Sequence, residues 1–245
     1  MSEKLPYTGT LARQYDPDRF FLTLLQPAAL RPALWALIAF HYEVAKTREV
    51  VSEPTLGFMR LQWWRENIEK ICNGAAAPAH EVLQPLAAAI GAYQLPFALF
   101  DRLITAREFD LEQGTPESLP ELVKYLSDTV TPLTELMLKV CGQDATGAGE
   151  ISIAYGLAGV MRAIPFHARQ GRCMVPPTLA DIDMLFSNDE KRRAALVILH
   201  NMAAQSLVDA GLFHAPLLKH MAKAADLYLS HMNKLDYDVR DARFD

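Results

Sequence analysis

Cysteine and a basic surplus are both missing from this sequence. Of its 245 residues only three are cysteine, and Cys72, Cys141 and Cys173 lie far apart without the spacing of metal ligands. Its 24 basic residues are outnumbered by 29 acidic ones, which gives a net charge of −5. A nucleic-acid-binding protein usually carries a basic excess or stripe. The sequence therefore predicts a reducing compartment, no structural metal and no nucleic-acid partner.

Long hydrophobic runs and targeting signals are also absent. Residues 1–6 form neither an apolar signal core nor an arginine-rich presequence. The longest strongly apolar stretch, residues 33–40, is much shorter than the roughly 20 residues that cross a bilayer. We therefore expect a cytoplasmic protein, with peripheral contact to the inner membrane if its ligand is a lipid.

Apolar side chains supply 51% of the chain, enough for a sizeable core, and the 12 glycines leave no flexible linker. We predict one domain over residues 1–245, with loosely ordered tails at 1–14 and 236–245. Apolar residues recur with helical spacing and never with the alternation of a strand, so the predicted fold class is all-α. Helices are expected to begin near Pro32 and near Thr55 and to cover about 80–93, 97–112, 119–141, 147–164, 189–211 and 215–233.

Two of these helices are apolar all round, which is typical of central helices. The first begins at Pro32 and the second covers residues 151–164, and each runs into a charged end. Such ends can line a pocket mouth or simply be solvated, and composition favours neither. Gly156 and Gly159 lie three apart in the second helix, where close helix packing is favoured over room for a ligand.

Several motifs resemble those of the squalene/phytoene synthase family, in order and spacing, between about residues 10 and 180. They are Tyr15–Phe20, Arg31–Leu37, Leu56-Gly57 with Arg60–Arg65, Arg107–Leu111, and Gly171-Arg172 before Val175-Pro176. The resemblance implies a single isoprenoid-synthase-like helical bundle with a central cavity. It also implies a reaction in which carboxylates hold Mg²⁺ ions against a prenyl diphosphate.

The acidic motifs that this reaction needs are degenerate by the same resemblance. The first motif falls on Ala45, Lys46 and Glu49, of which only Glu49 is acidic. The second falls on Ala163 and His167, with Pro165 between them, which tends to kink a helix. The resemblance therefore implies no confident catalytic residue, no metal site and no cofactor, with Mg²⁺ needed only by an active transferase.

Two stretches resemble a non-catalytic branch of the family, typified by the mitochondrial complex I assembly factor. They are residues 51–60 and 161–167, and residues 235–238 match more weakly. This resemblance implies protein partners, namely respiratory complex I subunits or assembly intermediates.

Basic residues stand where the family expects acids, and arginine forks bind phosphate or carboxylate without metal. We hypothesise that the old pocket holds an isoprenoid or anionic lipid, or an acidic segment of a partner. The candidate ligand-binding residues are Arg48, Glu49, Asp110, Arg162, His167, Arg169 and Arg172.

Other residues with chemical potential have simpler interpretations. His41 and Glu43 are two apart and do not share a helix face, so a structural or pocket-lining role is favoured over a metal pair. Glu108 and Glu112 are expected on a solvated face. Trp63 and Trp64 are adjacent, so one is expected inside and the other partly exposed. The exposed one could anchor a partner or a membrane interface, or simply pack against a neighbouring helix.

Three functions remain open. The first is a non-catalytic binding or assembly protein related to complex I, which the missing acids favour. The second is an active prenyl-diphosphate transferase, which predicts that Glu49, Asp110 and a further carboxylate cluster together. The third is an isoprenoid or quinone carrier, which predicts a deep apolar cavity.

Overall fold

Every regular element of this protein is a helix in a computed structural model that describes residues 5–112 and 114–244. The all-α prediction is therefore confirmed. The α-helices are α1 (Tyr7–Tyr15), α2 (Pro17–Leu24), α3 (Arg31–Ala45), α4 (Thr47–Val50), α5 (Pro54–Cys72), α6 (Leu83–Tyr93), α7 (Phe97–Ala106), α8 (Glu108–Glu112), α9 (Leu119–Thr129), α10 (Thr131–Cys141), α11 (Ala148–Arg162), α12 (Ile164–Arg169), α13 (Ile182–Ser187), α14 (Asp189–Asp209) and α15 (Pro216–Lys234), with a 3-10 turn η1 at Ala28–Leu30.

The helices group into two compact units. Unit 1 comprises residues 1–112 and 132–145, and unit 2 comprises residues 113–131 and 146–245. The prediction that the whole chain acts as one domain stays a prediction.

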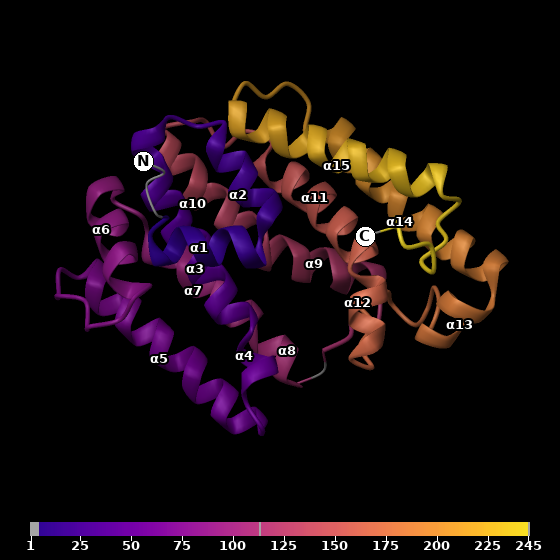
Figure 1. The fold of residues 1–245 in the computed structure, drawn as a ribbon, viewed down its shortest axis with the longest axis horizontal. Helices are drawn as coiled ribbons and strands as arrows, with labels where there is room; N and C mark the ends of the chain where they lie inside the picture. The colour runs from indigo at the N-terminus through magenta and orange to yellow at the C-terminus, as the bar shows by residue number, and fades with distance from the viewer. Residues whose placement is uncertain (1–4, 113, 245) are drawn as a thin grey trace. The chain divides into compact units, whose positions relative to one another are not determined.

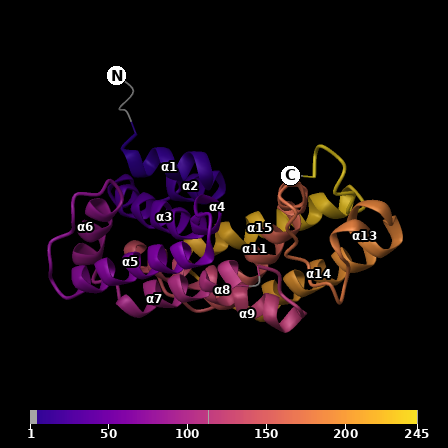
Figure 2. The same ribbon diagram turned by 90° about the horizontal axis from the view of Figure 1, so that it is seen from below.

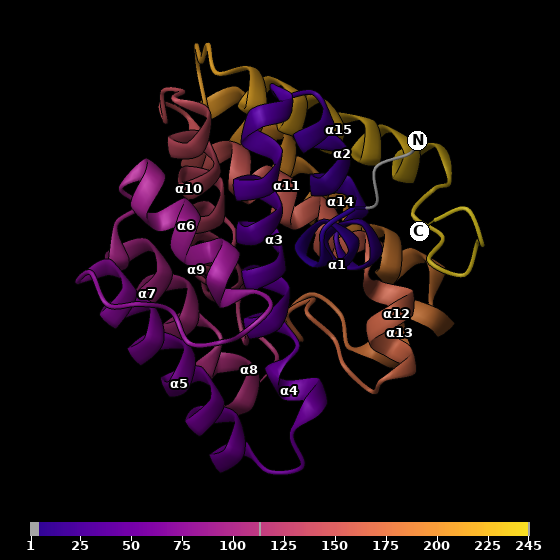
Figure 3. The ribbon, with the colours of Figure 1, turned by 60° about the vertical axis from the view of Figure 1, so that its left-hand side comes forward.

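Unit 1 is organised around α3. The side chains of Leu34, Leu37 and Phe40 are fully buried, as the all-round apolar pattern predicted. Helices α1 and α2 pack on one side of α3 and α6 packs on another (Figure 3). Helix α5 packs along α7 and α8 (Figure 2), and its approach to α8 is close, because a Cβ on Gly57 would lie 2.6 Å from Leu111 Cδ2.

Unit 2 is organised in the same way around α11, against which α9, α14 and α15 pack (Figure 1). The predicted close packing holds at Gly156, where a Cβ would lie 3.0 Å from Leu126 Cδ2. It does not hold at Gly159, where a Cβ would meet no described heavy atom within 4 Å. Each unit is thus built on one of the two helices that the sequence predicted to be central.

Three predicted helices are interrupted. The expected helix over 119–141 divides at Val130, because Pro132 cannot donate the backbone hydrogen bond that would continue it. The helix over 97–112 divides at Arg107, for which we have no local sequence explanation. The helix over 147–164 ends at Arg162, and α12 begins anew with Pro165 in its first turn, so the expected kink is confirmed.

Both predicted loose tails are wrong where the structure describes them. Residues 7–15 form α1, whose Gly9 would bring a Cβ within 2.9 Å of the Trp35 ring. In the C-terminal tail, Tyr237, Val239 and Phe244 are at most 3% exposed. Both segments are held by contacts with residues distant in sequence, which local composition does not reveal. The same prediction for residues 1–4 and 245 lies outside the described residues.

None of the helices in the described residues combines the length and hydropathy needed to cross a membrane.

Candidate functional site

Lys46 lies at the junction of α3 and α4, where the first acidic motif is expected. Its Nζ is 2.7 Å from Oε1 of Glu43, and the other oxygen of Glu43, Oε2, is 2.7 Å from Nη2 of Arg60. Glu43 is buried, at 6% exposed. Both of its carboxylate oxygens are therefore occupied by cations of this chain, and Lys46 is neutralised by a residue one turn earlier in α3.

Two tyrosine rings adjoin this cluster. Tyr42 and Tyr15 stack with ring centroids 3.9 Å apart, and Lys46 Nζ lies 4.7 Å from the centroid of the Tyr42 ring. Burial raises the pKa of Tyr42, and a hydrogen bond with Tyr15 and the nearby carboxylates raise it further. The Tyr42 phenol is therefore neutral at physiological pH and cannot act as a base there.

Arg48 and Asp110, two of the candidate ligand-binding residues, come together in unit 1, but not through their charges. Arg48 Nη1 donates to the backbone oxygen of Asp110 at 2.7 Å. The Asp110 carboxylate is 3.2 Å from Nη1 of Arg107, and Nη2 of Arg107 lies 3.1 Å from Nε2 of His41. Asp110 is 4% exposed, whereas Arg48, Arg107 and His41 around it are half-buried. Glu49 is exposed at the surface of unit 1 and lies close enough to Tyr42 to influence its pKa.

A polar cavity of about 510 Å³ adjoins the Glu43 cluster in unit 1. It is bordered by charged and hydrogen-bonding side chains, namely Tyr7, Glu43, Lys46, Arg60, His80 and Glu81, with Val50, Ala79 and Val82. Glu108, expected on a solvated face, instead accepts from Arg65 Nη2 at 3.0 Å, because α5 packs against α8. Glu112 is exposed.

The region of the second motif lies in unit 2, at the joint between α11 and α12. Arg162 ends α11, and its guanidinium carbon lies 3.8 Å from the centroid of the Tyr228 ring on α15. This contact borders a cavity of about 290 Å³ together with Leu227, His231, Met232 and Phe244. Ala163, at the joint, has no side chain that could hold a metal ion.

His167 and Arg172 lie where α12 ends. The backbone oxygen of His167 accepts from the backbone nitrogen of Arg172 at 2.9 Å. Gly171, with φ of +66°, allows the chain to turn there. The turn directs the chain from α12 toward α13.

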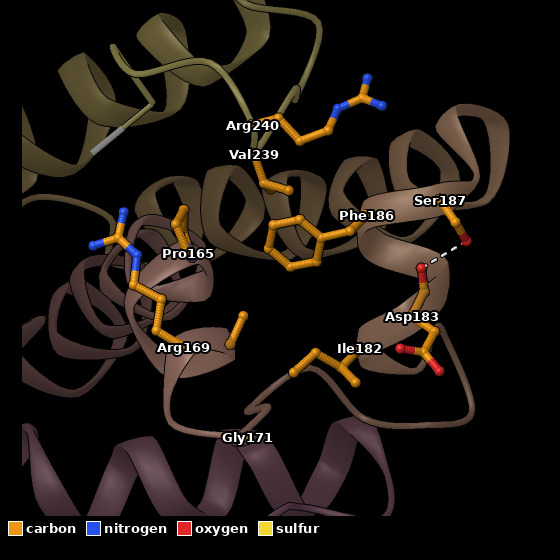
Figure 4. A pocket seen from close by; sticks show the side chains of 10 residues that line it. Pro165, Arg169, Gly171, Ile182, Asp183, Phe186, Ser187, Val239 and Arg240 are labelled. Carbon is orange, nitrogen blue, oxygen red and sulfur yellow. Dashed lines mark hydrogen bonds between the residues drawn. The ribbon is translucent and has the colours of Figure 1, made fainter.

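Arg169 borders a different cavity of unit 2, of about 910 Å³ (Figure 4). Apolar side chains point into this cavity, with the Phe186 ring near its centre and Val239 above it. The guanidinium of Arg169 and the charged groups of Asp183 and Arg240 point away from it (Figure 4). The lining is therefore apolar and the charges lie on the rim. The lining residues are Pro165, Ala168, Arg169, Gly171, Ile182, Asp183, Phe186, Ser187, Val239 and Arg240.

Sequence reasoning missed three partners of these residues. Glu43 has the structural and pocket-lining role that the sequence predicts, but its pairing with Lys46 was missed, although a spacing of three is typical of a helical ion pair. Arg60 and Tyr228 reach the site from other helices, and nothing local in the sequence indicates that they do. Within either unit, no three His, Cys, Asp or Glu side chains of the described residues gather as a metal site would require.

Comparison with known proteins gives one family and two kinds of relative. The family profile described as squalene/phytoene synthase matches residues 12–243. The "NADH dehydrogenase (ubiquinone) complex I, assembly factor 6" of Rattus norvegicus is 29% identical over 95% of this chain and 75% of its own length, and that of Homo sapiens is 27% identical over the same shares. The "15-cis-phytoene synthase" of Synechococcus elongatus is 23% identical over 72% of this chain and 62% of its own length.

Solved structures share the fold. The squalene synthase HpnC from Alicyclobacillus acidocaldarius superposes with a TM-score of 0.78 at 19% identity, covering 94% of this chain and 93% of its own. A dehydrosqualene synthase in complex with ligand gives 0.76 at 14% identity, covering 96% and 89%. At these identities the likeness concerns the fold alone.

Proposed function

The chain belongs to the squalene/phytoene synthase family, and we propose that within it this protein is a non-catalytic binding or assembly factor serving respiratory complex I. The observation that carries the proposal is the Glu43 cluster. At the place where the first acidic motif is expected, the buried carboxylate is held by Lys46 and Arg60 at 2.7 Å each.

This cluster does not fit a magnesium ion. Mg²⁺ takes oxygen ligands in octahedral geometry and is held by carboxylates whose oxygens are available. Both oxygens of Glu43 already contact cations, the Asp110 carboxylate is paired with Arg107, and Glu49 is exposed. An ion placed here would also meet the ammonium group of Lys46. This arrangement supports a protein that needs no metal cofactor, and it disfavours the active transferase.

The relatives also support an assembly role rather than catalysis. The complex I assembly factor 6 proteins of Rattus norvegicus and Homo sapiens match 95% of this chain, whereas the phytoene synthase of Synechococcus elongatus matches 72% at lower identity. By this likeness we propose complex I subunits or assembly intermediates as the partners. The proposal places the protein in the cytoplasm or at the inner membrane.

Catalysis is tested directly with farnesyl and geranylgeranyl diphosphate and with Mg²⁺ or Mn²⁺. We expect no metal-dependent release of diphosphate above that of heat-denatured protein. Metal-dependent release that is abolished by Glu49→Gln would restore the transferase. Lys46→Met is the matched control, because it removes the cation at the motif without adding a carboxylate.

The assembly role is tested in a host from which this chain has been deleted. We expect less assembled complex I on native gels. We also expect full rescue by Glu49→Gln, since this exposed carboxylate is not used for chemistry. Normal complex I in the deletion host would exclude the role.

A second candidate is the isoprenoid or quinone carrier, which is favoured by the apolar lining of the cavity in Figure 4. A carrier should bind farnesol without turnover and bind it more weakly after Phe186→Ser, while the control Phe166→Ser, at a 50% exposed position, leaves binding unchanged.

A further inference from the structure

Helix α5 exposes three large apolar side chains on one face. Leu56 is 48% exposed, Met59 is 65% exposed and Trp63 is 41% exposed. Their spacing of three and four residues places them in one row along the helix, which we call the α5 stripe. Helices α6, α7 and α8 all lie to the same side of α5 (Figure 3). Such a row of exposed large side chains marks an interaction surface more often than a single exposed residue does.

The exposed ring of Trp63 packs against two other rings of unit 1. Its ring makes an edge contact with Trp64, which is fully buried, at 5.2 Å between centroids, and lies 5.5 Å from the His80 ring. His80 is itself fixed, because its Nδ1 accepts from the backbone nitrogens of Val82 and Leu83 at 3.1 and 3.3 Å. One tryptophan is inside and one outside, as the sequence predicted. A fixed aromatic side chain loses little entropy on binding and is the usual anchor of a protein interface.

The exposed charges of residues 53–70 are mainly acidic. Glu53 and Glu66 flank the row, three residues before Leu56 and three after Trp63, and neither makes an ion pair with the residues that the structure describes. Glu69 is exposed farther round the helix, and the one exposed cation of this segment, Lys70, follows Trp63 by seven residues and lies on the line of the row. The two arginines of α5 are engaged elsewhere in unit 1. Arg60 is paired with Glu43, and Arg65 is paired with Asp101 and Glu108. The stripe therefore offers an apolar row bordered by negative charge.

From this surface we infer that the α5 stripe docks a basic amphipathic helix of a partner protein. Three apolar side chains of that helix would pack on Leu56, Met59 and Trp63, and its lysines or arginines would face the glutamates. The inference rests on the proposed binding role and names the chemistry of the partner segment. It does not require that the segment belong to complex I.

Charge argues against the other two occupants. An anionic membrane surface attracts basic segments, and the three glutamates would be repelled by it. A second copy would present the same patch in a symmetric interface, which brings an equally acidic border to the stripe. A basic amphipathic helix is the occupant that complements both the apolar row and the glutamates beside it.

The test uses the whole protein and a synthetic 18-residue helical peptide, with leucines at i, i+3 and i+7 flanked by lysines. Its matched control is the same peptide with glutamates in place of the lysines. Binding is measured by titration calorimetry at low and high salt. We expect the basic peptide to bind at least tenfold more tightly than the acidic one, with the difference shrinking as salt rises.

Variants locate the binding. Trp63→Ala and, independently, Met59→Ser should each weaken the binding of the basic peptide about tenfold or more. The control Leu212→Ser, at an 88% exposed position of unit 2, should leave the binding of the basic peptide unchanged. Two substitutions together, Glu66→Lys and Glu69→Lys, should reverse the preference between the peptides.

Three outcomes would overturn the inference. They are equal binding of both peptides, binding to phosphatidylglycerol vesicles that is lost in Trp63→Ala, and a dimer in sedimentation that Met59→Ser dissociates. None of them involves prenyl turnover, so the inference can fail while the proposed non-catalytic role stands.

Discussion

Both units bury charge, but they neutralise it in different ways. In unit 1 a buried acid, Glu43, is held between Lys46 and Arg60. In unit 2 a buried base, Arg192, donates to the backbone oxygen of Tyr237 at 3.0 Å and to Asp189 at 2.8 Å, with Asp238 at 3.7 Å. The first cluster lies where the sequence resemblance leads us to expect the family's first acidic motif, whereas the second holds the C-terminal tail against α14. A buried ion cluster therefore suggests function only through its position in the fold.

The largest expected effect concerns the two cores on which these clusters rest. Phe40→Ala in α3 and Leu157→Ala in α11 each delete a fully buried side chain. We expect each to lower the free energy of unfolding by about 3–5 kcal/mol, from lost burial and the cavity left behind. If the chain is one domain, scanning calorimetry will show a single transition that both variants shift together.

Two separate transitions, each shifted by only one of these variants, would contradict the single domain. Leu212→Ala, at an 88% exposed position, is the control and should shift no transition.

The second effect is the loss of folding stability when the charge of Glu43 is removed from the unit 1 cluster. Glu43→Gln keeps the shape of the side chain but leaves Lys46 and Arg60 without their counter-charge. We expect a loss of about 2–3 kcal/mol, below the value for a fully buried pair, because Lys46 and Arg60 remain 21% and 32% exposed and partly screened by solvent. Urea unfolding measures it, and Glu66→Gln on the surface of α5 should change stability by less than about 0.5 kcal/mol.

A loss as small as that of Glu66→Gln would mean that the cluster is not neutralised by Glu43. The Mg²⁺ site would then have to be reconsidered.

The third effect separates the unit 2 cluster from the unit 1 cluster. Arg192→Met removes charged hydrogen bonds to the tail, and we expect a loss of about 2 kcal/mol. Hydrogen exchange should accelerate in residues 236–244 and stay unchanged in α3. Uniform acceleration through both units would show that Arg192 supports more than the tail.

Sequence reasoning recovered the features that local patterns determine. The apolar faces of α3 and α11 identified the two central helices, Pro165 located the break between α11 and α12, and adjacent tryptophans implied one buried and one exposed ring. These follow from periodicity and from the chemistry of single residues.

Contacts between distant segments could not be read in the same way. Helix α1 and the C-terminal tail are ordered by Trp35 and by Arg192. The partners of Glu43 and of Arg162 include residues on other helices. The candidate ligand-binding set was chosen by position in a motif. The structure gives Arg162 a partner on α15 and Arg169 a place on the rim of another cavity.

The smallest expected effect is the pH dependence of the tail. A hydrogen bond from Arg240, with Arg192 nearby, lowers the pKa of Asp238 below its ordinary value of 3.8. Because the folded state lowers this pKa, the stabilisation is fully present above about pH 4 and is lost as the pH falls through the lowered value. The side chains of Asp238 and Arg240 are 35% and 44% exposed, so solvent screens their interaction. We therefore expect Asp238→Asn to cost only about 0.5 kcal/mol or less at pH 7. Urea titrations of both proteins between pH 7 and pH 3 should show the difference narrowing toward the acidic end. A difference that stays constant would assign the effect to backbone packing of the tail, and the contrast between the two clusters would then rest on Arg192 alone.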